Sequence, residues 1–134
     1  MSFTANLGNC FAGGALGGVA NTLAVWLAGA AGITHALGVA IAPELIPAMI
    51  YQRMVWGGTW GLLFVLPVLR GSIFWRGLVF SLGPTAVQLL VVFPHVANKG
   101  LYGLELGALT PGFVVLFNAV WGWVAAGWLK TSGR

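Results

Sequence analysis

Charged residues are scarce in this chain. Of its 134 residues, six are Lys or Arg and two are Asp or Glu, so that 6% of the sequence is charged. A soluble domain carries roughly 25% charged residues. This chain has too few to cover a surface that faces water, which excludes a soluble protein. Its basic residues are also scattered rather than clustered, so the sequence predicts no nucleic-acid partner.

Cysteine and catalytic motifs are missing as well. Cys10 is the only cysteine, which excludes an intramolecular disulfide and a cysteine-based zinc site. The sequence contains no HExxH motif, no GxxxxGK[ST] loop and no Ser/His/Asp order beside a tight turn. We therefore predict no enzyme activity, no cofactor and no metal site. One alternative stays open, an external metal site built from His35, Glu44, His95 and Glu105.

Hydrophobic residues make up most of the chain. They make up 59% of the chain, whose mean hydropathy is +0.94. Four apolar stretches are long enough to cross a bilayer, at about residues 8–30, 47–69, 74–93 and 111–129. Pro94 should end the third, and Pro111 stands at a favoured first helical position in the fourth.

These stretches predict an all-α, polytopic membrane protein. We expect one membrane domain over residues 1–134, folded as a bundle of four transmembrane helices. The semi-apolar connection 32–46 either lies at the interface or re-enters the bilayer.

The basic residues predict the orientation in the membrane. One side is expected to hold the middle hairpin and the C-terminus, and it carries most of the positive charge: Arg70, Arg76, Lys130 and Arg134. The opposite side has Lys99. Because Lys and Arg accumulate on the cytoplasmic side, both termini should be cytoplasmic.

Small residues form two stripes along the first predicted span. The small-xxx-small pairs there and the glycines of the second span form a predicted helix-packing face: Gly13, Gly14, Gly17, Gly18, Gly57 and Gly61. Inside lipid, close backbone approach through small residues is a main source of helix association. The face either packs within the chain or forms a seam with a second copy or another membrane protein.

Each predicted span carries one polar side chain at a similar depth. With a rise of 1.5 Å per residue, these side chains lie roughly 8 to 13 Å below one end of their spans. They are Asn21, Arg53, Gln88 and Asn118. Polar groups inside a membrane usually face the bundle interior. The layer is either a set of hydrogen bonds that fixes helix register or a polar vestibule open to the outer side.

Arg53 has three interpretations. Its side chain leans toward the outer surface, so that it can anchor the helix by reaching the interface. It can pair with Glu44 or Glu105, both in the outer connections. It can also coordinate a solute or an anion.

The two halves of the chain share a weak echo. Val55-Trp56-Gly57 recurs as Val120-Trp121-Gly122 about half a chain length later, and Gly38 and Gly103 keep the same offset. The hypothesis is a duplicated helical hairpin with a pseudo-twofold axis along the membrane normal.

Short motifs in the C-terminal half suggest a family. The stretch runs through Trp75-Arg-Gly-Leu, Gln88-Leu, Phe93-Pro94, Leu109-Thr-Pro111 and Val120-Trp121. Over roughly its last 60 residues, the chain resembles the YagU-like small inner-membrane proteins of bacteria. The resemblance implies a helical protein of the bacterial inner membrane with undefined activity, and it carries over no site residues.

Three functions follow as hypotheses. The first is a non-enzymatic membrane protein that acts through helix–helix association, as a homo-oligomer or as an accessory subunit of a membrane complex. Its partners would be the lipid bilayer and a second copy or another membrane protein. The alternative is a small oligomeric channel or transporter for an ion or small solute. The third is a binder of lipid or quinone that uses the tryptophans.

Overall fold

The chain folds into helices and their connections. The computed structural model describes residues 2–132, and no strand occurs in that range. In chain order the elements are α1 (Phe3–Ala30), α2 (Ile33–Ala36), α3 (Pro47–Gly61), the 3₁₀ turn η1 (Leu62–Val65), α4 (Ile73–Val87), the π-helix η2 (Gln88–Val96), the 3₁₀ segment η3 (Leu101–Leu106) and α5 (Thr110–Thr131). The all-helical prediction is confirmed.

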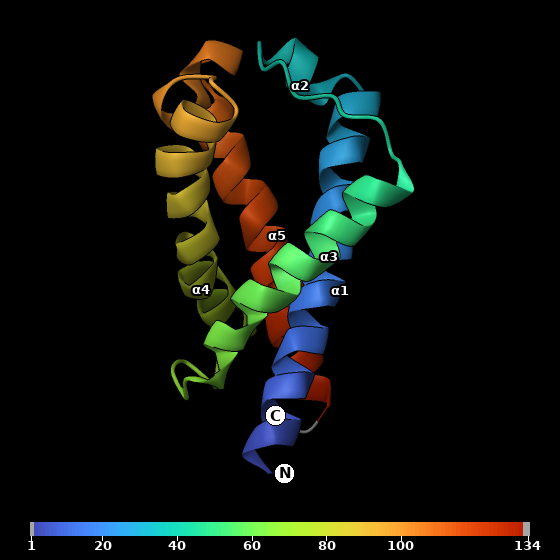
Figure 1. The fold of residues 1–134 in the computed structure, drawn as a ribbon, viewed down its shortest axis with the longest axis vertical. Coiled ribbons are helices and arrows are strands. Elements are labelled where there is room, and N and C mark those ends of the chain that lie inside the picture. The colour runs from blue at the N-terminus through green and yellow to red at the C-terminus, as the bar shows by residue number, and fades with distance from the viewer. Residues whose placement is uncertain (1, 133–134) are drawn as a thin grey trace.

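The long helices are arranged as two pairs, α1 with α3 and α4 with α5 (Figure 1). The pairs meet in the lower half of the molecule, where α1 also packs on α5, and they diverge toward the upper end. Both ends of the chain lie at the lower end, whereas α2 and the connection before α5 lie at the upper end. The backbones of the two pairs therefore lie farther apart at the upper end than at the lower end.

Three helices are long and apolar enough to cross a membrane, namely Phe3–Ala30, Ile73–Val96 and Thr110–Thr131. The first begins earlier than predicted because the Ser2 side chain caps it by accepting a hydrogen bond from the Ala5 amide at 3.1 Å.

The predicted second span is shorter than expected. The α3 helix starts below the upper end, crosses α1 obliquely and is prolonged by η1 as far as Val65 (Figure 1). Leu66 is extended, as the residue before a proline usually is, so Pro67 ends the helix. Residues 66–72 form a loop where the prediction had the span continue to residue 69.

The end predicted for the third span is wrong. Pro94 lies inside helical structure, because the helix changes at Gln88 to a π-helix that runs to Val96. A π-helix uses hydrogen bonds between residues five apart, as in the bond from the Ala97 amide to the Val92 carbonyl at 2.7 Å. The wider turn thus carries the chain past a proline that would interrupt an α-helix.

The glycines of α1 form two contact lines inside the chain. Gly14 packs against Gly57 and Gly61 of α3 so closely that a methyl group on Gly14 would overlap the Gly57 carbonyl. Gly17 faces the Trp121 backbone and ring of α5. Gly13 and Gly18 extend the two lines, Gly13 along Trp128 and Ala125, and Gly18 along the Arg53 and Met54 backbone. All six glycines of the predicted packing face are buried by the chain's own helices.

The second pair repeats the close contact of the first. Gly77 of α4 and Gly122 of α5 touch through their backbones, and an added methyl on either would meet the other's peptide. Gly122 occupies the place in its pair that Gly57 has in the first, half a chain length earlier. Both α3 and α5 also start with proline in the first turn. Each helix pair is therefore held close by contact between glycine backbones.

Candidate functional site

A chain of hydrogen bonds joins all four long helical stretches at one level. Arg53 of α3 donates through Nη1 to the Asn21 carboxamide oxygen of α1. Asn21 in turn donates to the Phe117 carbonyl at 2.8 Å and to Oδ1 of Asn118 at 3.5 Å, both in α5. Asn118 donates to Gln88 Oε1 at 3.3 Å. The structure thus brings together the four polar residues singled out in the sequence.

Thr85 is a fifth member that the sequence analysis missed. Its hydroxyl accepts a hydrogen bond from the Asn118 amide at 3.1 Å, and it is buried in α4. One such hydrogen bond joins the helices of each pair. Arg53 of α3 donates to Asn21 of α1, and Asn118 of α5 donates to Thr85 of α4. The duplication echo leads only to the neighbour of Thr85, because the offset from Val55 to Val120 pairs Asn21 with Ala86.

These side chains line a small cavity. It measures about 40 Å³ and is bounded by the four polar residues together with Val25, Ile41, Val114 and Phe117. A water molecule needs at least about 10–15 Å³ of such space, so the cavity has room for two or three. Asn21 and Asn118 are buried, whereas Arg53 and Gln88 are partly exposed.

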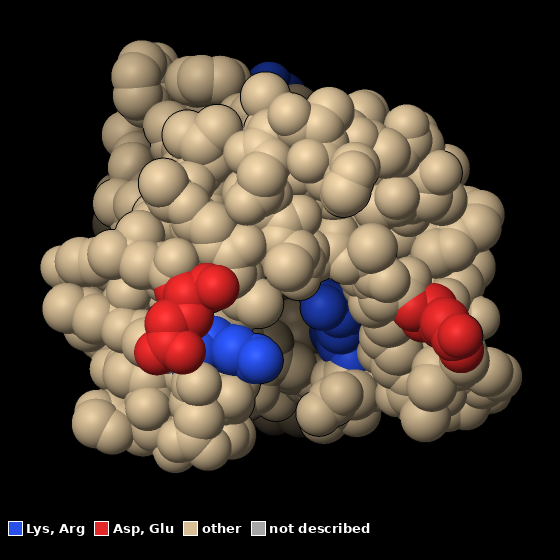
Figure 2. All heavy atoms as spheres, turned by 90° about the horizontal axis from the view of Figure 1, so that it is seen from above, with Lys and Arg blue, Asp and Glu red and all other residues tan. Residues whose placement is uncertain are grey.

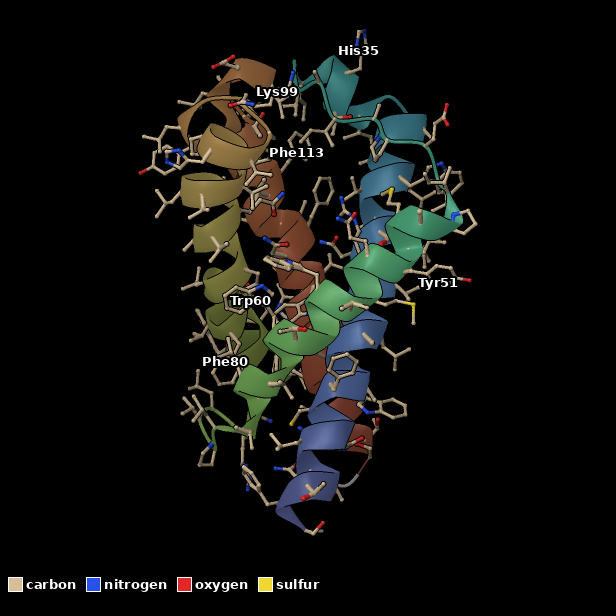
Figure 3. All side chains as sticks on the ribbon, viewed as in Figure 1. His35, Tyr51, Trp60, Phe80, Lys99 and Phe113 are labelled. Carbon is tan, nitrogen blue, oxygen red and sulfur yellow. The ribbon has the colours of Figure 1, made fainter. Side chains whose placement is uncertain are left out.

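The molecule is hollowed above this level. Figure 2 shows the upper end with a depression between the elements, basic side chains inside it and acidic side chains on its rim. Phe113 projects from α5 into the space between the two helix pairs, while His35 and Lys99 lie at the upper end (Figure 3). The polar level is therefore reached from one end of the molecule.

Two upper connections meet beside the hollow. The Ala40 amide donates to the Leu106 carbonyl at 2.8 Å, and Gly107 touches the Gly38 backbone. Gly107 has a φ of 149°, so a side chain there would be strained as well as crowded. This contact ties the connection after α1 to the connection before α5.

The predicted partners of Arg53 lie elsewhere. Glu44 and Glu105 are both exposed, and no ion pair with Arg53 forms among residues 2–132. Its guanidinium points into the bundle to Asn21, a neutral acceptor. His35 and His95 are exposed too, and no three His, Cys, Asp or Glu side chains of the described residues lie together as metal ligands would.

An aromatic layer closes the space below the polar level. Trp121 is 3% exposed, and its indole N–H donates to the carbonyls of Gly14 at 3.1 Å and Gly57 at 3.3 Å. Its ring centroid is 5.8 Å from that of Phe64, which lies 4.7 Å from that of Phe80. The polar level thus opens upward and is sealed downward.

Arg76 lies on the far side of this layer. It was predicted to lie in the basic hairpin between the second and third spans, but it belongs to α4. The Ser72 side chain caps α4 by accepting from the Trp75 amide, so Arg76 falls within the first turns of the helix. Arg76 is 5% exposed and donates to the carbonyls of Phe64 at 2.7 Å and Leu66 at 3.2 Å. A serine placed to cap a helix was the sequence signal that α4 begins before Arg76.

A second, apolar groove of about 470 Å³ lies along α3 and η1. It is lined by Trp56, Thr59, Trp60, Leu62, Leu63, Val65 and Leu66. Its walls suit hydrocarbon. Thr59 bonds back to its own helix, at the Val55 carbonyl, so the polar groups that the lining side chains still offer are the indole N–H groups of Trp56 and Trp60.

Comparison with known proteins gives no match for this chain among family models, curated sequences or solved structures. The resemblance to YagU-like proteins therefore stays a prediction from the motifs of the C-terminal half, and the site is interpreted from its own geometry.

Proposed function

We propose that this chain is a multi-pass membrane protein that binds a small hydrophilic solute at the polar level and passes it across the membrane. One observation carries the proposal. Four helical stretches each contribute a polar side chain to a single hydrogen-bonded cavity where the two helix pairs meet. Substrate sites of transporters built from repeats lie in the same kind of place, near the bilayer midplane at the repeat interface.

The proposed embedding has four crossings. α1, α4 with η2, and α5 are full spans, and α3 with η1 is an oblique fourth span that the segment 37–46 reaches by re-entering from the upper surface. Large apolar side chains exposed along these helices, such as Leu23, Leu82 and Leu116, support burial in lipid. The lower end, with both termini and most basic residues, faces the cytoplasm of a bacterial inner membrane in this proposal.

Helix–helix association is the second candidate. The glycines that motivated it already pack against helices of the same chain, so a second copy or another membrane subunit would have to dock on a different face. One chain encloses a small cavity, and transport by an oligomer remains compatible with both proposals. We rank transport first because the polar cavity is present in the single chain, and we propose no catalytic role.

Flux measurements test this proposal. The purified protein is reconstituted in liposomes, and uptake of small solutes and salts is followed by light scattering. We expect at least one solute to cross faster than in protein-free liposomes. Asn118→Leu should abolish that flux because Asn118 joins the two pairs, whereas Thr59→Val, in the apolar groove, should preserve it. Absence of flux for every solute would contradict transport. Flux insensitive to Asn118→Leu would place the path elsewhere.

A further inference from the structure

The interior of the bundle holds positive charge without a compensating carboxylate. Arg53 is bound by the neutral carboxamide of Asn21, and Arg76 is bound by two backbone carbonyls. The chain has two carboxylates in all, Glu44 and Glu105, and both are exposed. Ionisable residues within a membrane usually pair with one another or with backbone carbonyls and mark ion pathways. A buried cation with no carboxylate partner creates a favourable place for a mobile anion.

The geometry points to a small monovalent anion as the solute of this site, an inference that rests on the proposed function. The donors around the cavity match that ligand. Gln88 lines the cavity and accepts from Asn118 through Oε1, which leaves its N–H₂ group outside that bond. Arg53 uses one terminal nitrogen for Asn21, and guanidinium carries five N–H donors in total. Both groups can therefore donate to an anion without breaking the network.

Cavity size narrows the class further. About 40 Å³ accommodates two or three water-sized particles. A halide or a planar anion of a few atoms, such as nitrate, fits that space, whereas a sugar acid or a nucleotide does not. A single guanidinium at this level also favours one negative charge over two.

The charge along the approach to the site changes sign with depth. Basic side chains lie inside the upper hollow and acidic side chains on its rim (Figure 2), and Lys99 stands at the upper end (Figure 3). Positive charge inside a hollow of low dielectric raises the local concentration of anions there, and it acts against the two carboxylates at the rim. Cations are disfavoured at the polar level by the charge of Arg53.

Arg76 provides a second station beyond the aromatic layer. Its guanidinium carbon lies 5.3 Å from the centre of the Phe64 ring and 5.9 Å from that of Phe80. Its Nε is buried and has no hydrogen-bond partner within the described residues. An anion that passes the layer of Phe64, Phe80 and Trp121 therefore meets a donor on the other side. The layer itself is the barrier that must move.

The experiment compares ions of opposite charge in one preparation. Proteoliposomes containing a halide-quenched dye report chloride, bromide and nitrate entry, while potassium and urea fluxes are measured in parallel. With the native protein, the rate of anion entry should exceed the rate of potassium entry by about tenfold or more. Arg53→Gln should reduce anion flux by about tenfold or more, since charge-assisted hydrogen bonds are the strong ones. Arg53→Lys should keep part of it. Arg70→Gln, in the exposed lower loop, is the matched control and should change nothing.

Direct binding separates the two proposals. In detergent, sodium nitrate should raise the melting temperature of the native protein above that in sodium gluconate, and Arg53→Gln should lose this increment while remaining helical by circular dichroism. Nitrate stabilisation without any flux would overturn transport and keep the anion site. Flux of urea or potassium equal to anion flux, with no nitrate-specific stabilisation, would overturn the anion site and keep transport.

Discussion

At the scale of single residues, the two arginines of the lower half differ in what they touch. Arg76 binds the Phe64 carbonyl of η1 and the Leu66 carbonyl just after it, which also accepts from the Val68 amide at 2.8 Å. Arg70 is exposed in the connecting loop. Arg76 therefore fastens the end of the α3–η1 stretch to α4, and its ring contacts with Phe64 and Phe80 hold the aromatic layer from below.

This difference predicts opposite effects of one substitution. Arg76→Met should lower the free energy of unfolding by about 1.5–3 kcal/mol, because hydrogen bonds to a charged donor are lost and the buried Phe64 carbonyl stays unsatisfied. Arg70→Met should change it by less than about 0.5 kcal/mol. Tryptophan fluorescence during SDS titration of detergent-solubilised protein measures both. Equal midpoints for the two variants would contradict the fastening role of Arg76.

At the scale of elements, the helix pairs depend on backbone contact. Gly122 touches Gly77 across the α4–α5 pair, whereas Gly127, one and a half turns further along α5, has no atom within 4 Å of the place where a methyl would stand. The same helix thus offers a crowded and an open glycine.

Alanine at these two positions should have different effects on stability. Gly122→Ala should destabilise the protein by about 1–3 kcal/mol, since overpacking forces the backbones apart. Gly127→Ala should be neutral or slightly stabilising, because alanine favours helix. Thermal unfolding followed by circular dichroism compares them. A Gly122→Ala variant as stable as Gly127→Ala would show that the pair tolerates separation.

Sequence patterns predicted the apolar helices, and the polar residues that they named lie at one level, because apolar length and helical rise are local properties. They failed where the outcome depends on tertiary partners. Pro94 is passed by a π-helix, the second span stops early before Pro67, and Arg76 is buried by carbonyls from another helix. The sequence also could not predict which helix packs on the glycine face, since small residues fit a helix of the same chain as well as one from another chain.

At the scale of the whole molecule, the two ends differ in charge and in form. The upper end is hollowed and carries both carboxylates, while the lower end holds both termini and the loop around Arg70. Cys10 is 1% exposed and should stay unlabelled in the folded protein. A single added cysteine can therefore report the orientation of each end in a protein that keeps Cys10.

Labelling in intact cells tests the proposed orientation. Ala36→Cys places an exposed thiol at the upper end in α2, and Gly71→Cys places one at the lower end, where a side chain meets no atom within 4 Å. An impermeant maleimide should label Ala36→Cys in intact cells and Gly71→Cys after permeabilisation, with the unmodified protein as control. The reverse pattern would turn the vestibule toward the cytoplasm. Anions would then reach Arg53 from inside the cell.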